Sequence, residues 1–220
     1  MLPYPLRHGL IVLLVSSILV VISYTNVDKP LVYWAYHQHL REVNGLNYLS
    51  YFPNIFNVFA LLAYPILLLR FFYKRFNVND SNCLYIANSI AIAHFLKSLL
   101  KALFGRTWPV TWKCNNLSLI QDQVYTLHWF QGGVINDAFP SGHMATTVAA
   151  MAALAIAYPK LRVMAGLICS LVAIGLIALY YHYCSDVIAG ALLGYLTAYY
   201  AAYFSKIKLL NYQKVSPVST

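Results

Sequence analysis

The sequence contains few charged residues. Aspartate, glutamate, lysine and arginine together make up 10% of the 220 residues, whereas soluble globular domains carry about 25%. Hydrophobic residues make up 60% of the chain, and its mean hydropathy is +0.61. This composition excludes a soluble globular domain and indicates an integral membrane protein.

The sequence also lacks the alternation of apolar and polar residues that marks a transmembrane β-barrel. Its apolar stretches are continuous instead, and they are long enough to cross a bilayer as helices, which takes about 20 residues each. We therefore predict an all-α fold, an integral membrane bundle of six transmembrane helices. The expected spans cover residues 9–24, 55–73, 84–104, 141–158 and 163–181, and a last span ends near residue 204.

Cysteines are few, and their spacing matches neither a CxxC pair nor a metal site. The chain has four, at positions 83, 114, 169 and 184. Cys114 and Cys184 are expected near the same membrane face, so a disulfide is one alternative, and two separate small residues are the other. His37 and His39 have no third ligand nearby, so we predict no metal site and no cofactor.

Acidic residues are scarce as well, which leaves a formal net charge of +9. Such a charge can indicate nucleic-acid binding, but the basic residues cluster at the ends of apolar spans and not on an aromatic-interleaved patch. We therefore expect no nucleic-acid partner. Six spans place both termini on one side, and most basic residues fall there, which predicts cytoplasmic termini: Arg7, Arg70, Lys74, Arg75, Lys160, Arg162, Lys206, Lys208 and Lys214.

The stretch Phe-Pro-Ser-Gly-His at residues 139–143 marks the start of a helix. Ser141 is a strong N-cap residue before an apolar run. The first backbone N–H groups of such a helix have no intrahelical partner, and its dipole is positive at that end, so an anion near Ser141 and Gly142 is stabilised. His143 then lies in the first turn, within reach of that anion.

The expected span over residues 84–104 contains three ionisable side chains. His94, Lys97 and Lys101 share one helix face, and ionisable groups in membrane helices usually face a polar interior. Lys101 lies nearest the water and has more weight than His94 and Lys97, which could simply be buried and paired. The long polar connection that follows, residues 105–139, is a functional candidate because of its length.

The predicted topology brings the ends of three spans together at the outer face. Cations and backbone amides there could hold a phosphoryl group, while one histidine attacks it and another protonates the leaving oxygen. Asp186 follows His182 by one helical turn and could orient its ring. The candidate site residues are Lys101, Arg106, Ser141, Gly142, His143, His182 and Asp186.

This ordered set resembles the type 2 phosphatidic acid phosphatase superfamily, which has the motifs K-x6-R-P, P-S-G-H and S-R-x5-H-x3-D. The second motif is matched in full at residues 140–143, and His182 and Asp186 match the end of the third. The likeness covers about residues 54–204. It implies that His182 is the nucleophile and His143 the general acid.

The same resemblance implies that Asp186 is the partner of His182, and that Ser141 and Gly142 bind the phosphate. Lys101 and Arg106 are expected to hold it as cations. The implied reaction is metal-independent hydrolysis of the phosphate monoester or pyrophosphate of a lipid, through a phosphohistidine and without a cofactor. A lipid phosphotransferase on the same scaffold is an alternative.

Two positions depart from the family motifs. Trp108 stands where the arginine of the first motif is expected, and Leu176 where that of the third is expected. Neither replaces a guanidinium, so the chain resembles a divergent member of the superfamily that lacks the motif-three arginine. Arg106 could supply one of the missing cations, and Lys97, Lys113 and His128 are candidates for the other. A catalytically inactive lipid-binding membrane protein is therefore a further alternative.

The resemblance also implies a partner and a location. The superfamily handles lipid A phosphates, isoprenyl pyrophosphates and glycerophospholipid phosphates, so we expect one such lipid as substrate and no obligate protein partner. The location expected is a bacterial inner membrane with the site facing the periplasm. The expected divisions are a first transmembrane helix with an outer interfacial segment (1–53), a catalytic helical core (54–205) and a basic cytoplasmic tail (206–220).

Overall fold

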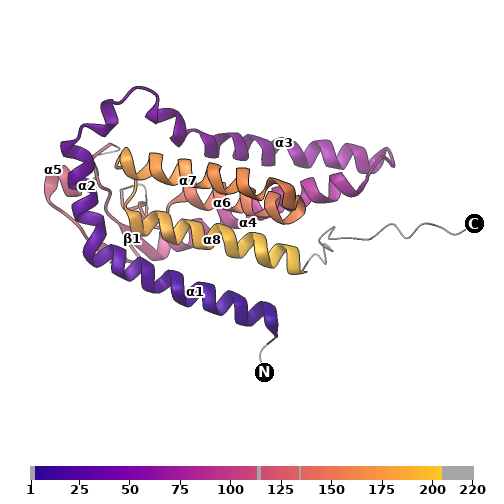
Figure 1. Ribbon diagram of the computed structural model, residues 1–220, viewed down its shortest axis with the longest axis horizontal. Coiled ribbons are helices and arrows are strands. Elements are labelled where there is room, and N and C mark those ends of the chain that lie inside the picture. Colours follow the sequence, from indigo (N-terminus) through magenta and orange to yellow (C-terminus); the bar gives the residue numbers. More distant parts are fainter. Residues whose placement is uncertain (1–2, 113–114, 134, 205–220) are drawn as a thin grey trace, which may run out of the picture.

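The structure is a computed structural model that describes residues 3–112, 115–133 and 135–204. The long helices run side by side along its longest axis (Figure 1). The start of α1, the turn between α3 and α4, and the end of α8 all lie at one end of this bundle. Cys114 and the expected tail over residues 206–220 lie outside the described residues.

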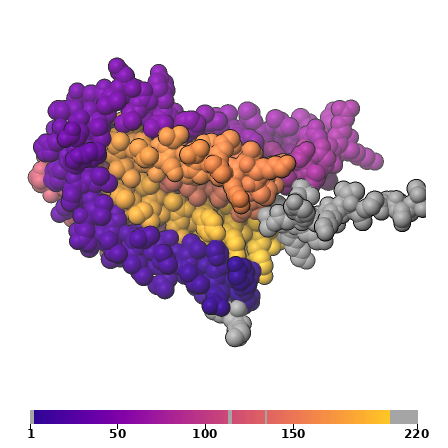
Figure 2. Space-filling model, viewed as in Figure 1, coloured from indigo at the N-terminus to yellow at the C-terminus, as the bar shows by residue number. Residues whose placement is uncertain are grey.

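The first helix is longer than the sequence predicted. It was expected to end near residue 24, but α1 (Tyr4–Ile22) continues through the π-helical segment η1 (Ser23–Val27) into α2 (Asp28–His37). Pro30 lacks a backbone N–H, and a π-helical turn is a common adjustment where the regular ladder is interrupted. At this point α2 turns away from α1 (Figure 1), and the whole segment wraps round one end and one flank of the molecule (Figure 2).

Two short 3-10 helices, η2 (Leu40–Glu42) and η3 (Leu46–Ser50), lead into α3 (Phe52–Phe72). The segment over residues 25–53, expected to lie along the membrane interface, is therefore largely helical.

Helix α4 (Val78–Leu103) begins six residues before the expected start of its span. Asn77 caps it: its side chain accepts hydrogen bonds from the backbone N–H groups of Asn79 and Asp80 at 2.9 and 3.1 Å. The Asp80 carboxylate in turn accepts from the Asn77 N–H at 2.8 Å, which completes a capping box. Part of the connection that the predicted spans left between residues 73 and 84 is thus the cap and first turn of α4.

The connection from α4 to α6 contains a small antiparallel β-ribbon that the sequence analysis did not predict. Strand β1 (Phe104–Arg106) pairs with β2 (Leu127–Trp129), and the short helix α5 (Leu119–Asp122) lies between them in sequence. Paired aromatic side chains favour such ribbons, and the rings of Phe104 and Trp129 lie 4.9 Å apart. The ribbon holds this connection against the end of α4.

The C-terminal half consists of α6 (Gly142–Ala157), η4 (Pro159–Leu161), α7 (Arg162–Ala178) and α8 (Cys184–Phe204). Helix α6 packs tightly on α8. A Cβ atom on Gly194 would lie 2.5 Å from the carbonyl oxygen of Ala145, and one on Gly190 would overlap the carbonyl oxygen of Ser141. Small residues of this kind let two membrane helices approach closely.

The predicted membrane bundle is confirmed in its essentials. By length and apolar composition, five helical segments of the described chain can cross a membrane: Tyr4–His37, Leu46–Phe72, Val78–Leu103, Pro159–Ala178 and Cys184–Phe204. The remaining expected span corresponds to α6, which is shorter, with 16 residues. Helix α6 starts where the sequence predicted, because Ser141 is its N-cap.

The contact between α6 and α8 should be sensitive to one added methyl group. We expect Gly194→Ala to lower the thermal unfolding temperature in detergent, because its Cβ would press on the backbone of α6, and overpacking costs about 1–3 kcal/mol. Gly166→Ala in α7 is the matched control, since nothing lies within 4 Å of its added Cβ. Equal unfolding temperatures for the two variants, followed by circular dichroism, would contradict this packing.

Candidate active site

The N-terminus of α6 is tied to the first turn of α8. Ser141 caps α6 by accepting a hydrogen bond at Oγ from the backbone N–H of Met144, at 3.3 Å. Its own backbone N–H donates to the carbonyl oxygen of Asp186 at 3.0 Å. Gly142 is the first residue of α6, so the unpaired N–H groups and the positive end of the helix dipole lie beside it.

A cavity of about 260 Å³ lies next to this helix start. It is bounded by α3, α4, α6, the connection from α4 to α6, and the connection from α7 to α8. Four of the seven predicted site residues line it, namely Lys101, Gly142, His143 and His182. The other lining residues are Pro53, Asn54, Asn57, His94, Lys97, Trp108, Trp112, Asp137 and Thr146.

Two histidines face each other across the cavity. His143 lies in the first turn of α6, and His182 lies in the connection that leads into α8. Their ring centroids are 6.0 Å apart, with the planes inclined at 62°. Because both histidines line the same cavity, a phosphoryl group bound there beside the two rings could contact a nitrogen of each.

Asp186 lies behind His182, away from the cavity. Its Oδ2 atom is 3.6 Å from His182 Nδ1 and accepts a hydrogen bond from the backbone N–H of Tyr183 at 3.0 Å. His182 is only 2% exposed. Burial lowers the pKa of His182, and Asp186 raises it by a smaller amount. The ring is therefore neutral at pH 7, with a carboxylate placed to stabilise it once it becomes charged.

Two lysines of α4 bring positive charge to the cavity. Lys101 Nζ donates a hydrogen bond to the backbone carbonyl of Asp137. Lys97 lies one turn earlier, and its Nζ is 3.2 Å from the position that a Cβ atom on Gly142 would occupy. Lys97 had less weight than Lys101 in the sequence, but the structure places both ammonium groups at the cavity.

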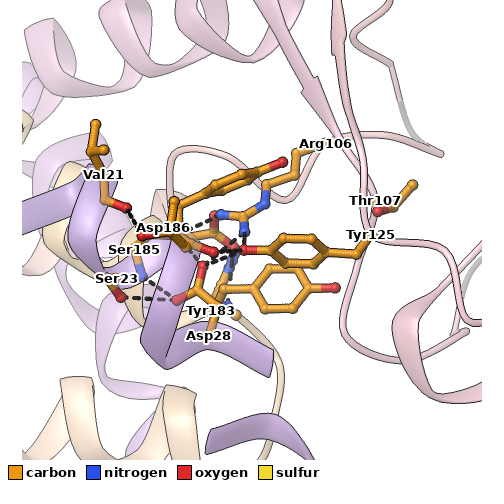
Figure 3. A network of polar contacts seen from close by, with 12 residues as sticks. Val21, Ser23, Asp28, Arg106, Thr107, Tyr125, Tyr183, Ser185 and Asp186 are labelled. Carbon is orange, nitrogen blue, oxygen red and sulfur yellow. Dashed lines mark hydrogen bonds and ion pairs between the residues drawn. The ribbon is translucent and has the colours of Figure 1, made fainter. Parts of the chain in front are cut away.

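The structure places two of the predicted phosphate ligands outside the cavity. Arg106 is 1% exposed and Ser141 is fully buried, and neither lines the cavity. The Arg106 guanidinium is held between the carboxylates of Asp28 and Asp186 (Figure 3), and the Ser141 hydroxyl caps α6. Both side chains are thus engaged in contacts within the protein, while the expectation that Arg106 and Ser141 bind the phosphate stays a prediction.

The two positions that depart from the family motifs lie in different surroundings. Trp108 lines the cavity, and its ring centroid is 5.2 Å from that of His182. Its indole Nε1 is buried and has no hydrogen-bond partner among the described residues. Leu176 is fully buried in an apolar cluster with Met144 and Val172. A cation at position 176 would therefore meet an apolar environment, whereas position 108 faces the cavity.

A polar wall from α3 was not found in the sequence. Asn54 and Asn57 line the cavity, and the Oδ1 atom of Asn57 lies 2.7 Å from His94 Nε2. Thr146 of α6 approaches the same nitrogen at 3.2 Å. His94 is thus paired, which is one of the two interpretations left open for it. Two asparagines three residues apart in an apolar helix were the available signal, since such a pair shares one helix face.

Metal ligands do not cluster in the described part of the chain: no group of three or more histidine, cysteine, aspartate or glutamate side chains could hold an ion there. His39 instead pairs with Glu42 at 3.2 Å on the surface. The groups that border the cavity include two histidines, two lysines and the start of α6.

Fold and site together define a helical membrane protein with a histidine pair, a buried carboxylate and lysines gathered at one helix N-terminus. Residues 82–209 match the PAP2 superfamily. This match covers more than half of the sequence, and the chain belongs to the PAP2 superfamily. The assignment confirms the resemblance found in the motifs and supports, in general terms, a membrane phosphatase.

Two solved structures resemble the chain. LpxE from Aquifex aeolicus is 20% identical, with a TM-score of 0.42 over 69% of this chain and 85% of that protein. A PAP2-type phosphatidylglycerolphosphate phosphatase from Bacillus subtilis is 18% identical, with a TM-score of 0.48 over 92% of this chain and 98% of that protein. Both scores lie below 0.5, so the family assignment rests on the sequence match. A comparison with curated proteins finds no match.

The buried position of His182 predicts a shifted titration. Burial disfavours the charged ring, so we expect the pKa of His182 to lie below the ordinary value of about 6.5. Diethyl pyrocarbonate modifies only the neutral ring, and mass spectrometry of the modified peptide as a function of pH measures the midpoint. A midpoint at or above that of histidine in a short peptide would contradict the described surroundings.

Proposed function

We propose that the chain hydrolyses the phosphate monoester or pyrophosphate of a lipid through a phosphohistidine on His182. The observation that supports this most directly is that His143 and His182 line the same cavity, with their ring centroids 6.0 Å apart. Asp186 lies behind one ring, and a helix N-terminus and two lysines border the space between the rings. These are the parts that phosphoryl transfer requires: a nucleophile, an acid and positive charge.

The first step transfers the phosphoryl group to the enzyme. Nδ1 of His182 faces Asp186, so Nε2 is the nucleophile. It attacks phosphorus, a P–N bond forms, and the P–O bond to the lipid breaks. His143 gives its proton to the departing lipid oxygen. Asp186 stabilises the positive charge that develops on the phosphorylated ring.

The second step releases inorganic phosphate. A water molecule attacks phosphorus and gives its proton to His143, which now acts as a base. The P–N bond breaks, and its electron pair returns to Nε2 of His182. Both histidines are then in their starting protonation states, and the cycle needs no metal ion or cofactor.

The negative charge of the phosphate meets several donors in this proposal. Lys97 and Lys101 supply two cations, and the first N–H groups of α6 at Gly142 supply backbone donors. Trp108 stands where the family motif has an arginine and offers its unpartnered indole N–H, which can donate to an oxygen but carries no charge. Lys97 thus takes over part of the task of the missing arginines.

The surroundings of the cavity favour a lipid as substrate. The cavity lies at the end of the bundle opposite the start of α1. The indole rings of Trp112 and Trp129 are exposed at that end, where aromatic side chains suit the headgroup layer. The phosphate would enter the cavity while the tail stays in the bilayer. With cytoplasmic termini, as the basic residues indicate, this end faces the periplasm of a bacterial inner membrane.

The proposal is tested by phosphate release from a panel of lipid phosphates in the presence of a chelator. We expect His182→Asn and His143→Asn each to reduce kcat by about a thousandfold or more, because each removes a reacting group. His37→Asn is the matched control, since His37 is exposed on α2. Full activity of either cavity variant would overturn the mechanism. Labelled phosphate appearing on a second lipid would indicate the phosphotransferase instead.

The contribution of Lys97 to phosphate binding can be measured separately from that of the histidines. We expect Lys97→Met to lower kcat/KM by about a hundredfold, because a preorganised charge next to the helix N-terminus is lost. Lys160→Met is the control, since Lys160 is exposed at the opposite end of the bundle. Steady-state kinetics on the best substrate of the panel provides the comparison. If the two variants have equal kcat/KM, Lys97 does not bind the phosphate.

A further inference from the structure

The N-terminal segment brings an aspartate to the site from outside the region that matches the family. Asp28 begins α2 and is fully buried, and the family match starts only at residue 82. A fully buried carboxylate is costly unless it is paired and hydrogen-bonded. The partners of Asp28 therefore indicate what this carboxylate does.

Both oxygens of the Asp28 carboxylate are fully engaged (Figure 3). Oδ1 accepts hydrogen bonds from Ser23 Oγ and from the backbone N–H of Ser185, each at 2.9 Å. Oδ2 accepts from Arg106 Nη2 at 2.8 Å, from Tyr125 OH at 3.0 Å and from Ser185 Oγ. These hydrogen bonds fix the carboxylate of Asp28 in place.

Arg106 links Asp28 to the carboxylate behind the nucleophile. One end of its guanidinium, Nη2, donates to Asp28, and the other end, Nη1, donates to Asp186 Oδ1 and to Ser185 Oγ. The remaining oxygen of Asp186, Oδ2, is the one that faces His182. The order of groups is therefore Asp28, Arg106, Asp186, His182, from the N-terminal segment to the cavity.

The charges of Asp28, Arg106 and Asp186 explain why a second carboxylate is needed to stabilise a cationic His182. Arg106 with Asp186 as its only counter-ion would form a neutral pair, and Asp186 would then stabilise a cationic His182 poorly. Asp28 neutralises Arg106 from the other side, so that the net negative charge of the three groups remains available to His182. Among the described residues, Lys101 and His143 also face the His182 ring, and neither supplies negative charge. His94, Lys97 and Asp137 line the same cavity.

We infer that Asp28 is a positioning residue of the reaction, which acts through Arg106 to keep the charge of Asp186 available to the phosphorylated His182. The inference rests on the proposed function for its kinetic consequence. It gives the N-terminal segment a role in catalysis in addition to its role as a membrane span. It also gives Arg106 a use other than phosphate binding.

The test replaces Asp28 with its neutral isostere. We expect Asp28→Asn to lower kcat about tenfold or more while KM changes less than about threefold, because the substrate does not touch Asp28. Loss of a negative charge near His182 lowers its pKa. The acidic limb of the kcat/KM profile therefore moves to lower pH. If Asp28→Asn has the wild-type kcat and the acidic limb of its kcat/KM profile does not move, the inference is overturned.

A second variant separates charge from folding and remains informative if Asp28→Asn does not fold. The double variant Asp28→Asn with Arg106→Gln removes one negative and one positive charge, so the three positions keep the wild-type net charge of −1, which Asp186 carries next to His182. We expect the acidic limb of its kcat/KM profile at the wild-type pH or above it. The removed positive charge of Arg106 is nearer to His182 than the removed negative charge of Asp28, so the pKa of His182 does not fall. A limb below the wild-type position would overturn the inference.

Asp80→Asn is the matched control. Asp80 is also a buried aspartate paired with an arginine, with its Oδ1 at 2.8 Å from Arg70 Nε, but it lies at the opposite end of α4 from the cavity. We expect this variant to change stability without moving the acidic limb. A shift equal to that of Asp28→Asn would mean that general loosening of the fold causes the effect, and it would overturn the inference.

A readout without substrate keeps this inference distinct from the proposed function. The pH dependence of His182 modification by diethyl pyrocarbonate reports its titration whether or not a lipid phosphate is hydrolysed. If the wild-type chain releases no phosphate, the proposed function fails. If Asp28→Asn leaves the modification midpoint of His182 unchanged, the present inference fails independently.

Discussion

The close contact between α6 and α8 is the constraint on which the site depends. Gly190 and Gly194 let the two backbones approach, and the Ser141 N–H donates to the carbonyl of Asp186 at their ends. This contact places the first turn of α6 opposite the residue pair His182 and Asp186. Without it, the two histidines would lie at separate helix ends.

The polar groups of this end of the bundle are divided between two layers. Lysines, histidines and the start of α6 line a cavity that a charged headgroup can enter. Behind it, Arg106 is buried between Asp28 and Asp186 and is surrounded by tyrosine rings. Its guanidinium carbon is 4.2 Å from the ring centroid of Tyr183. Burial makes each charge in that layer depend on its neighbours, and this dependence couples the N-terminal segment to the cavity.

Much of the fold could be predicted from the sequence, with errors where local chemistry was misjudged. The scarcity of charge indicated the membrane, and the apolar runs located α3, α6 and α7 to within three residues. The start of α4 was placed too late because the apolar run begins only at residue 84, whereas Asn77 and Asp80 form a capping box that starts the helix earlier. The continuation of the first helix through Pro30 and the β-ribbon were missed, since both depend on packing against other segments.

The sequence by itself determined the membrane class, the start of α6 at Ser141 and the spacing of His182 from Asp186. These features depend on composition and on residues that are close in the chain. Only the tertiary structure decided which cations border the cavity. Arg106 turns away from it because Asp28, 78 residues earlier, meets its guanidinium, and Lys97 borders it because α4 packs beside the start of α6. Contacts between distant segments set the direction of each charged side chain, and no local pattern encodes them.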